Sequence, residues 1–528
     1  MQKKTLKYPV GMQSFEKIIR ENYAYVDKTD LIYKMISEGT YYFLSRPRRF
    51  GKSLLLSTIE AYFQGKRELF RGLAIDSLTE EWEPHPVLHI DLNVQKYDSA
   101  ESVDKILDIY LSEWEREYGI EDVSDSISLR FYKIIAAAHA KTGRKVVILV
   151  DEYDKPLTES ILDEELSEDL RSSLRAFYGN LKTQDRHIKF AMLTGVTRFS
   201  RMTIFSGLNN LKDISMSGAY ESICGITQEE LCRHFMPAVD ELGVRRGLDR
   251  EGTLALLREW YDGYRFSEVR RDVYNPYSLL SVFSDMKMGI YWFRTATPRF
   301  LVRLLTERGV PFGMLQDFET DALTLSEIDS FRRNPVSLLF QTGYLTIKDY
   351  DEMDNECVLG YPNREVKESF LGYLYRYILG EERIDFATEQ RFAVKEFSRD
   401  MRRGDAEGFM QRFASLYSTL NLDPRGSQEA HYQNAVYLLF TLLGYRTGLE
   451  VHSSRGRSDL VVEAGEYVYV FEFKTGSSAE AALEQIGERG YSRPYLGTGR
   501  KLFEIGINFD PHTRSLTPWL IRERQDFS

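Results

Sequence analysis

Residues 41–59, YYFLSRPRRFGKSLLLSTI, place an apolar strand-like run before a glycine, a lysine and a serine, and a helix-like run follows. This order is typical of a phosphate-binding loop, whose pattern is G-x-x-x-x-G-K-[ST]. Gly51, Lys52 and Ser53 match the second half of the pattern, whereas Arg46 stands where the first glycine is expected. The segment therefore predicts a nucleotide site whose loop departs from the pattern at one position.

The chemistry of the matching half supports this prediction. Lys52 is expected to place its charge on the β- and γ-phosphates, Ser53 to offer its hydroxyl to magnesium, and the N–H groups opening the helix to bind oxyanions. Pro47 favours an extended Arg46, so the loop can leave the strand without a glycine there. A basic turn before an ordinary helix is the alternative. The predicted nucleotide contacts in this segment are Arg46, Arg49, Gly51, Lys52, Ser53 and Leu54.

An α/β sheet is predicted for the first 226 residues or so, because strand-like and helical runs alternate there. The candidate strands are residues 41–45, 87–92, 146–150 and 189–194. The third, VVILV, is apolar throughout, as in a strand covered by helices on both faces. It ends in Asp151 and Glu152, at the edge where open α/β sheets bind ligands. Asp151 is expected to hold magnesium through water, and Glu152 to act as general base; the alternative is an acidic loop that caps a strand.

The strand after this acidic pair ends at Thr194, and the polar segment that follows carries Arg198 and Arg201. Thr194 is expected to sense the γ-phosphate. One of the arginines is expected to stabilise the transferred charge, in its own subunit or in a neighbouring one, which leaves room for a homo-oligomer. A loop arginine is more often simply solvated.

Length and charge limit the remaining choices. The chain has 528 residues, enough for roughly three or four domains of about 150 residues each. We find no membrane-spanning run and no signal peptide, so we expect a cytoplasmic protein. The net charge of −11 argues against nonspecific coating of nucleic acid, so such contact is expected in one region only. The three cysteines are too few and too scattered for a disulfide framework or a structural zinc site.

Helices dominate from Thr227, which forms a capping-box pattern with Glu230. Residues 336–362 predict a helix followed by two strands joined by an acidic turn, the outline of a winged helix. That turn, DYDEMDNE, would repel phosphates, so we expect this region to pack and couple rather than to bind DNA. The turn-prone NLDPRGS marks the next boundary. The predicted segments are therefore 1–226, 227–420 and 421–528.

The last segment contains a hairpin with a sharp polar pattern. Period-2 spacing over residues 467–474 puts Glu472 and Lys474 on one face and four aromatic residues on the other. If Gly465 and Glu466 form a tight turn, Ala464 pairs with Tyr467, and counting back sets Asp459 opposite Glu472. Cross-strand Cβ atoms lie about 5 Å apart, so the two carboxylates could share a divalent cation.

Asp459, Glu472 and Lys474 thus form a D-x(n)-[DE]-x-K arrangement suited to magnesium-dependent phosphodiester hydrolysis. Lys474 is expected to orient a water or to steady the charge that develops on a phosphate. An exposed amphipathic hairpin with a charged face is the alternative. Further candidates are a metal ligand, two possible substrate contacts and two local cations: Glu429, Gln485, Tyr491, Arg455 and Arg457.

Together RPRRFGKSLLLST, VDEYDKPL, LTGVTRFSRMTIFSGLNNL, DLVV, FEFK, ALEQI and GYSRPY resemble the bacterial family that joins an AAA-ATPase-like domain to a C-terminal PD-(D/E)xK nuclease-superfamily domain. The resemblance covers nearly the whole chain. It implies a P-loop NTPase domain and a nuclease fold with Asp459, Glu472 and Lys474 in the signature positions. With the helical and winged-helix-like region predicted between them, the fold class is α/β. The resemblance also implies Walker roles for Lys52, Ser53, Asp151 and Glu152. Two departures are Arg46 at the first Walker glycine and a Gln485–Tyr491 spacing wider than Q-x-x-x-Y.

These inferences favour an ATP-regulated, magnesium-dependent nuclease that acts on DNA rather than RNA, in defence or mobile-element processing. A competing hypothesis is an ATP-driven signalling or scaffold protein whose nuclease-like domain binds nucleic acid or a partner without cutting. The intact Asp459, Glu472 and Lys474 disfavour it. A third hypothesis, a nonhydrolysing nucleotide sensor, draws only on the missing glycine.

Overall fold

A computed structural model of the chain describes the following residues: 7–121, 125–161, 163–199, 210–293, 301–302, 305, 312–326, 335–378, 397, 399–418, 437–439, 441, 446–453, 456–475, 477–509, 516 and 518–524. They fall into two compact units. Unit 1 comprises Met1–Ala296 and Glu319–Val366, and unit 2 comprises Thr297–Phe318 and Lys367–Ser528. The boundaries predicted at 226 and 420 stay a prediction.

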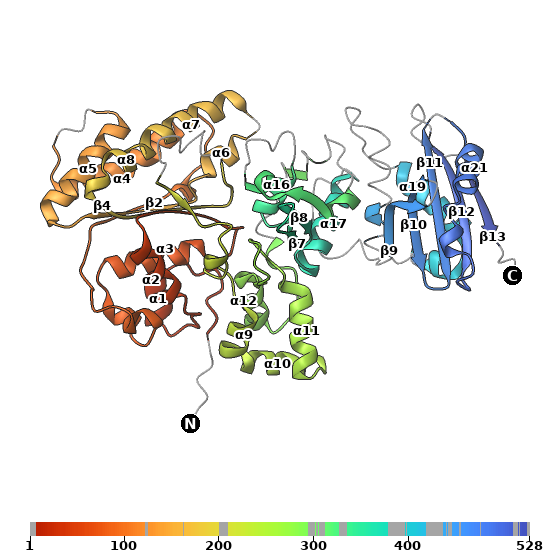
Figure 1. Ribbon diagram of the computed structural model, residues 1–528, viewed down its shortest axis with the longest axis horizontal. Coiled ribbons are helices and arrows are strands. Elements are labelled where there is room, and N and C mark those ends of the chain that lie inside the picture. The colour runs from red at the N-terminus through yellow and green to blue at the C-terminus, as the bar shows by residue number, and fades with distance from the viewer. Residues whose placement is uncertain are drawn as a thin grey trace. The chain divides into compact units, whose positions relative to one another are not determined.

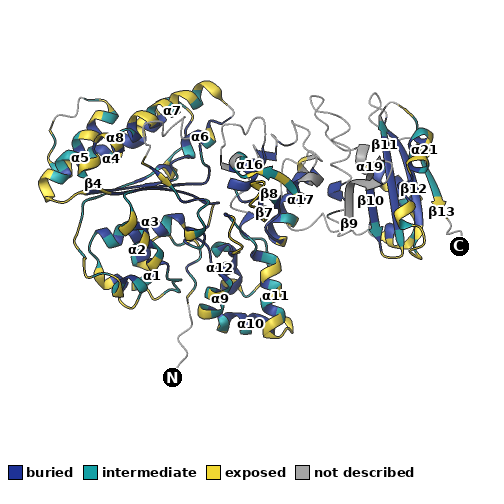
Figure 2. Ribbon diagram, viewed as in Figure 1, coloured by how far each residue is buried: buried dark blue, intermediate teal, exposed yellow. Residues whose placement is uncertain are grey.

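Unit 1 is built on a parallel sheet of five strands in the order β2-β3-β4-β1-β5. The strands are β1 (Tyr41–Ser45), β2 (Val87–Asp91), β3 (Val146–Asp151), β4 (Ile188–Gly195) and β5 (Lys212–Asp213). All residues of β1 and β3 are buried, because helices cover both faces of the sheet (Figure 2). The four predicted strands are therefore confirmed to within one residue at their ends.

Helices α4, α5, α7 and α8 lie on one side of this sheet, and α1, α2 and α3 lie on the other (Figure 1). Their bounds are α1 (Phe15–Arg20), α2 (Thr29–Glu38), α3 (Lys52–Phe63), α4 (Ser102–Tyr118), α5 (Ile127–Thr142), α6 (Lys155–Glu159), α7 (Glu164–Tyr178) and α8 (Asn180–Thr183). Short 3-10 turns connect them: η1 (Arg67–Phe70), η2 (Ala74–Ser77), η3 (Leu92–Val94) and η4 (Asp185–His187). This arrangement leaves the carboxyl ends of β1 and β3 together at one edge of the sheet.

The rest of unit 1 is helical and ends in a small sheet. The helical elements are η5 (Gly218–Tyr220), α9 (Gln228–His234), α10 (Met236–Arg246), α11 (Arg250–Tyr261), α12 (Pro276–Asp285), α15 (Ala322–Ser326) and α16 (Val336–Gln341). Strands β6 (Phe318–Asp321), β7 (Thr346–Asp351) and β8 (Glu356–Gly360) follow the order β6-β8-β7. Helix α16 followed by the antiparallel β7–β8 pair confirms the predicted helix and two strands, and Thr227 with Glu230 forms the predicted capping box.

Unit 2 contains a mixed sheet in the order β13-β12-β11-β10-β9. The strands are β9 (Arg446–Ser453), β10 (Gly456–Ala464), β11 (Tyr467–Thr475), β12 (Lys501–Phe509) and β13 (Trp519–Arg524). The accompanying helical elements are η6 (Phe312–Leu315), α17 (Arg364–Ile378), α19 (Ala406–Ser418), α21 (Ala479–Arg489) and η7 (Arg493–Tyr495). Val468 and Val470 of β11 pack with Ile486 of α21, while Phe471 contacts Phe409 of α19 on the other face. The hairpin is therefore covered on both faces, not exposed on its polar face.

Helix α21 approaches the sheet closely at Gly506 of β12, the residue that pairs with Glu472. A Cβ atom at Gly506 would lie 2.4 Å from the carbonyl oxygen of Ala479. Glycine therefore lets α21 settle beside the polar residues of β11. Among the described helices, none is long and apolar enough to cross a membrane.

Candidate functional site

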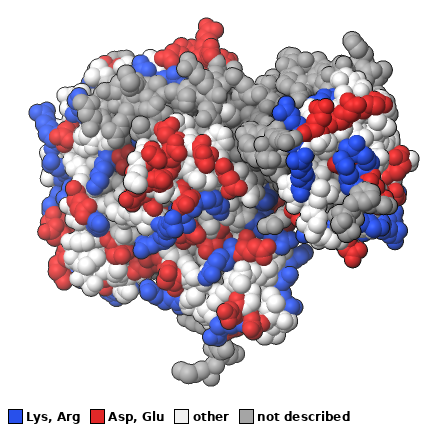
Figure 3. All heavy atoms as spheres, turned by 45° about the vertical axis from the view of Figure 1, so that its right-hand side comes forward, with Lys and Arg blue, Asp and Glu red and all other residues white. Residues whose placement is uncertain are grey.

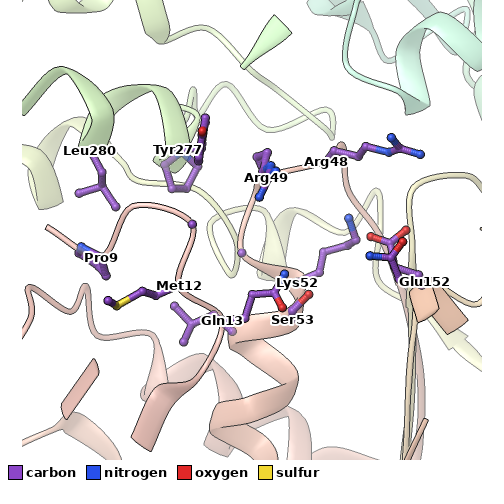
Figure 4. Close-up of a pocket in the computed structure, with 15 residues that line it drawn as sticks. Pro9, Met12, Gln13, Arg48, Arg49, Lys52, Ser53, Glu152, Tyr277 and Leu280 are labelled. Carbon is purple, nitrogen blue, oxygen red and sulfur yellow. The ribbon is translucent and has the colours of Figure 1, made fainter. Parts of the chain in front are cut away.

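The loop between β1 and α3 opens on a cavity of about 250 Å³. Gly51, at the N-cap of α3, has φ 96°, a left-handed conformation that glycine adopts without strain. The N–H groups of the first helical turn therefore face a site suited to an anion. The cavity is lined by Pro9, Gly11, Met12, Gln13, Arg48, Arg49, Gly51, Lys52, Ser53, Leu54, Asn93, Glu152, Pro276, Tyr277 and Leu280 (Figure 4).

Six residues of the sequence prediction line this cavity: Arg49, Gly51, Lys52, Ser53, Leu54 and Glu152. Lys52 is only 4% exposed, and its Nζ donates to the carbonyl oxygens of Arg46 at 3.0 Å and Pro47 at 3.4 Å. Figure 4 shows Lys52 extending toward Glu152, with Pro9, Met12 and Leu280 on the opposite side of the loop. The cavity thus has a charged end and a more apolar end.

Asp151 and Glu152 occupy the predicted place at the end of β3. The Asp151 carboxylate is buried and accepts from the Thr194 hydroxyl at 2.6 Å and from the Glu152 N–H at 3.0 Å. Glu152 has φ 52°, in the left-handed region, which costs a non-glycine residue about 1–3 kcal/mol. Such strain next to a cavity is typical of a functional residue.

Thr194, which was predicted to contact the γ-phosphate, is not among the residues that line the cavity. It is fully buried, and its hydroxyl is used on Asp151. The Thr194 hydroxyl therefore holds the carboxylate of Asp151 and does not face the cavity. Asp151 itself is not among the residues that line the cavity.

Arg46 and Arg198 are also not among the residues that line the cavity. Arg46 is 1% exposed, donates to the carbonyl oxygens of Ser45 and Ser215, and stacks on Phe266 with its guanidinium 4.2 Å from the ring centre. Burial lowers its pKa to about 10. The buried Arg46 guanidinium is held by these carbonyl oxygens. The contact of Arg46 with Lys52 Nζ is made by its backbone carbonyl oxygen.

The Arg198 guanidinium forms an ion pair with Asp213, with 2.6 Å between Nε and Oδ2. The Arg198 N–H donates to the side chain of Gln341 at 2.7 Å. Both contacts hold Arg198 on the side of β5 and α16. The other predicted arginine, Arg201, lies outside the described residues.

Two further carboxylates lie at this edge of the sheet and were missed. Asp91 pairs with Asp151 across β2 and β3, and burial, followed by the charges of Asp151 and Glu152, raises its pKa. Asp154 is buried and accepts from the N–H groups of Val196 and Thr197. Burial, then the charge of Glu152, raises the pKa of Asp154 to about 6. The run VDEYD was the available signal for Asp154.

The apolar end of the cavity was also missed. It comes from residues 9–13 before the first helix and from Pro276, Tyr277 and Leu280 of α12. Tyr277 carries the Arg49 guanidinium 4.9 Å from its ring centre. No local motif marks these residues, because they come from two segments that are more than about 200 positions apart in the sequence and meet only in the fold.

In unit 2, the β10–β11 hairpin has the predicted turn and register. Gly465 has φ 64°, and the pairs run from Ala464–Tyr467 to Leu460–Phe471. One further step along this ladder brings Asp459 level with Glu472. The side chains of Asp459 and Arg457 are not described, and Glu429 and Arg455 lie outside the described residues.

Four predicted residues of this domain converge: Glu472, Lys474, Gln485 and Tyr491. Lys474 Nζ donates to Glu472 Oε1 at 3.2 Å and to Gln485 Oε1 at 2.6 Å. The Gln485 amide in turn donates to Glu472 Oε1 and to the Tyr491 hydroxyl, the latter at 3.3 Å. The wider spacing therefore still brings both side chains to one place, because Tyr491 lies just beyond the end of α21.

The oxygen donors at both sites have the chemistry that magnesium prefers. They are the Ser53 hydroxyl and Asp151 carboxylate in unit 1 and the Glu472 carboxylate, 2% exposed, in unit 2. Over the part of the chain that is described, no group of three or more His, Cys, Asp or Glu side chains could hold a metal. The predicted ligand set in unit 2 also draws on Asp459 and Glu429, so that set extends beyond the described side chains.

Comparison with known proteins gives two family matches. Residues 9–205 match a predicted AAA-ATPase, the AAA-ATPase-like family, and residues 427–519 match the PD-(D/E)XK nuclease superfamily. A relative from Azotobacter chroococcum mcd 1, described as an uncharacterized protein in the vnfD 5' region, is 36% identical over 527 residues, which cover 98% of each chain. The first matched segment contains the phosphate loop and the acidic pair of the nucleotide cavity, and the second contains the hairpin site. Such domains imply the use of nucleotide and of divalent metal.

Proposed function

The chain belongs to the family that joins an AAA-ATPase-like domain to a C-terminal PD-(D/E)XK nuclease-superfamily domain, and we propose that it hydrolyses ATP and cleaves nucleic acid in a magnesium-dependent reaction. We further propose that DNA is the preferred substrate, that ATP regulates cleavage, and that the context is defence or mobile-element processing. In the proposed division, segment 1–226 is the ATPase-like domain, segment 227–420 is the helical and winged-helix-like lid or linker, and segment 421–528 is the nuclease-like domain.

In the ATPase part, Lys52 neutralises phosphate charge, and the N–H groups opening α3 bind phosphate oxygens. Ser53 and Asp151 are the groups that would hold magnesium, which supplies charge stabilisation for the transferred phosphoryl group. Glu152, at the cavity wall, takes the proton of the attacking water. Thr194 keeps Asp151 in place through the 2.6 Å hydrogen bond.

In the nuclease part, Asp459 and Glu472 are the groups that would hold the metal, whose role is to activate water and polarise the phosphodiester. Lys474 stabilises the negative charge that develops on the phosphate. Gln485 orients both side chains, because it bonds to Lys474 and Glu472 at once. The observation that carries this proposal is the convergence of Glu472, Lys474 and Gln485 beside the register position of Asp459.

The surface charge argues against recruitment of nucleic acid by the protein as a whole. On the face in Figure 3, basic and acidic side chains are intermixed and neither sign forms a continuous field. The net charge of the chain is −11. A nucleic acid is therefore recruited by the C-terminal site and its surroundings, not by the charge of the whole protein.

The test uses the full chain with magnesium, ATP, and single- and double-stranded DNA and RNA. Wild type is expected to hydrolyse ATP and to cut DNA faster than RNA, with a chelator abolishing cleavage. Asp459→Ala is expected to lose cleavage and keep ATP hydrolysis, and Lys52→Ala to lose both if ATP licenses cleavage. Lys105→Ala, on the exposed face of α4, is the control and should keep both.

Each arm of this test can fail separately. Absence of cleavage of all four substrates by wild type in the presence of ATP would refute the nuclease proposal. Cleavage by Lys52→Ala at the wild-type rate would refute ATP control while leaving the nuclease intact.

A further inference from the structure

The phosphate loop, residues 46–50, is held by residues far along the chain rather than by glycines of its own. Trp292 is fully buried, and its Nε1–H donates to the carbonyl oxygen of Arg48 at 3.0 Å. The Trp292 ring packs on Tyr344, with 5.3 Å between ring centres. The Trp292 and Tyr291 N–H groups donate to Glu365, at 2.8 and 2.5 Å, which anchors the indole.

Two apolar contacts hold the residues on either side of Arg48. Gly343 (φ 87°) lies against Pro47, and a Cβ atom on this glycine would be 2.7 Å from the proline ring. Phe50 packs edge-on against Tyr264, with 4.8 Å between ring centres. The loop is thus gripped on both sides of the Trp292 hydrogen bond.

A second link joins the same region to the end of β4. Gln341, the last residue of α16, accepts from the Arg198 N–H at 2.7 Å and donates to the Leu325 carbonyl at 2.8 Å. Arg198 is four residues beyond Thr194, which holds Asp151. The segment 336–344 therefore contacts both the loop that carries Lys52 and the strand end that positions the acidic pair.

Lys52 connects phosphate binding to these contacts. Its Nζ donates to the carbonyls of Arg46 and Pro47, on either side of the position where Gly343 packs. A phosphate oxygen that binds Lys52 competes with these carbonyls. Arg49, two residues after Pro47, has φ 69°. A non-glycine residue keeps this left-handed conformation only when its surroundings impose it.

We propose that Trp292 is a positioning residue of the nucleotide site: it holds the phosphate loop in the geometry that binds ATP and conveys ATP binding to α16. The proposal rests on the proposed ATP-binding function. One hydrogen bond within the protein favours the loop geometry that it holds by about 2- to 10-fold over alternative geometries, so its loss can weaken ligand binding by up to that factor. Trp292→Phe, which keeps an aromatic ring but loses the N–H donor, should therefore raise the ATP dissociation constant about 5-fold.

The matched control is Trp260→Phe. Trp260 lies on α11 under the guanidinium of Arg364, at 4.8 Å, and does not line the cavity. It should leave the ATP dissociation constant, measured by calorimetry with magnesium, within about 2-fold of wild type. Equal dissociation constants for Trp292→Phe and wild type would overturn the proposal.

A spectroscopic readout separates positioning from simple structural support. The chain contains five tryptophans, so 5-fluorotryptophan labelling gives five fluorine resonances, and the one lost in Trp292→Phe is that of Trp292. ATP should shift this resonance and leave that of Trp114, on α4, unchanged. Lys52→Ala should abolish the shift. Hydrogen exchange of unlabelled wild type gives the same test without a tryptophan variant: ATP should change the exchange of residues 336–341.

The possible failures are distinct. If calorimetry shows that wild type binds ATP but neither the Trp292 resonance nor the exchange of residues 336–341 changes, the inference fails and ATP binding stands. If wild type does not bind ATP at all, the proposed function fails, and the inference fails with it.

Discussion

In the nucleotide cavity, Lys52 is held by two backbone carbonyls of its own loop, whereas in the C-terminal hairpin, Lys474 is held by the side chains of Glu472 and Gln485. The cavity is assembled from several separate segments of the chain, and remote residues hold its phosphate loop. In the hairpin site, Glu472, Lys474 and Gln485 lie on two adjacent elements, β11 and α21, whose regular geometry fixes these side chains. A site of the first kind depends on contacts far from its chemistry, and one of the second kind depends mainly on local register.

The largest expected effect belongs to Glu152→Gln. General bases contribute about 10²- to 10⁴-fold to rate, so ATP hydrolysis should fall by that factor while ATP binding persists. Glu152 lines the cavity beside Lys52, and the contacts described above for the phosphate loop do not involve it. Steady-state hydrolysis and calorimetry measure the two quantities. Glu113→Gln, on the exposed side of α4, is the control, and loss of ATP binding in Glu152→Gln would contradict the assigned role.

Glu472→Gln should affect only the hairpin site. Glu472→Gln removes one of the two carboxylates that would hold the metal. Changes in groups that merely support metal ligands cost about 10- to 100-fold, so loss of a ligand itself should lower cleavage by about 100-fold or more. ATP hydrolysis should stay unchanged. The matched control is Glu463→Gln, on the same hairpin near its turn, where Glu463 pairs with Val468 and forms an ion pair with Arg500. Equal loss of cleavage in both variants would show that the hairpin, not the site, had been damaged.

The same difference between the two sites explains which of their features could be predicted from the sequence. The turn at Gly465 and the period of the strand determine the register, so the shared face of Glu472 and Lys474 followed from regular geometry. Gln485 and Tyr491 were predicted only as substrate contacts, and the hydrogen bonds that join Gln485 to this pair and to Tyr491 depend on how α21 packs on the sheet. The strand ends and the capping box at Thr227 were predictable because their signals are local.

The walls of the nucleotide cavity were not predictable in this way. Tyr277 and Trp292 reach the phosphate loop only through tertiary packing, and no periodicity connects them to residues 46–50. Arg46 was misplaced for a related reason. Its position in the motif suggested a phosphate contact, but the carbonyl of Ser215 and the ring of Phe266 offer the buried guanidinium better partners inside the fold.

Arg49→Ala tests whether the loop itself contributes charge. Arg49 is exposed, lines the cavity and stacks on Tyr277. A charge-assisted hydrogen bond is worth about 1.5–3 kcal/mol, so ATP affinity should fall by at least about 10-fold, while Arg49→Lys should keep most of it. Arg71→Ala, an exposed arginine beyond η1, is the control. Unchanged affinity in Arg49→Ala would confine phosphate recognition to Lys52 and the helix N-terminus.

The smallest effect concerns stability and pH. Burial raises the pKa of Glu365 from 4.5 to about 7, although it accepts from the Ser278 hydroxyl and from the N–H groups of Tyr291 and Trp292. The folded state therefore keeps a proton that the unfolded state releases. The stability from this proton is full below pH 4.5 and is lost as the pH rises through about 7.

Glu365→Gln stays neutral and should remove this part of the pH dependence, which amounts to about 1.4 kcal/mol per pH unit at most. Urea unfolding measured between the two pKa values should show wild type losing stability relative to the variant as pH rises. Glu368→Gln, exposed on the same helix, should follow wild type. Parallel pH curves for wild type and Glu365→Gln would contradict the assignment. Because Glu365 accepts from the N–H group of Trp292, loss of this pH dependence in Glu365→Gln alone would also show that the backbone of Trp292 is anchored by a titrating group outside the nucleotide cavity. The described part of the hairpin site gives no counterpart to such an anchor.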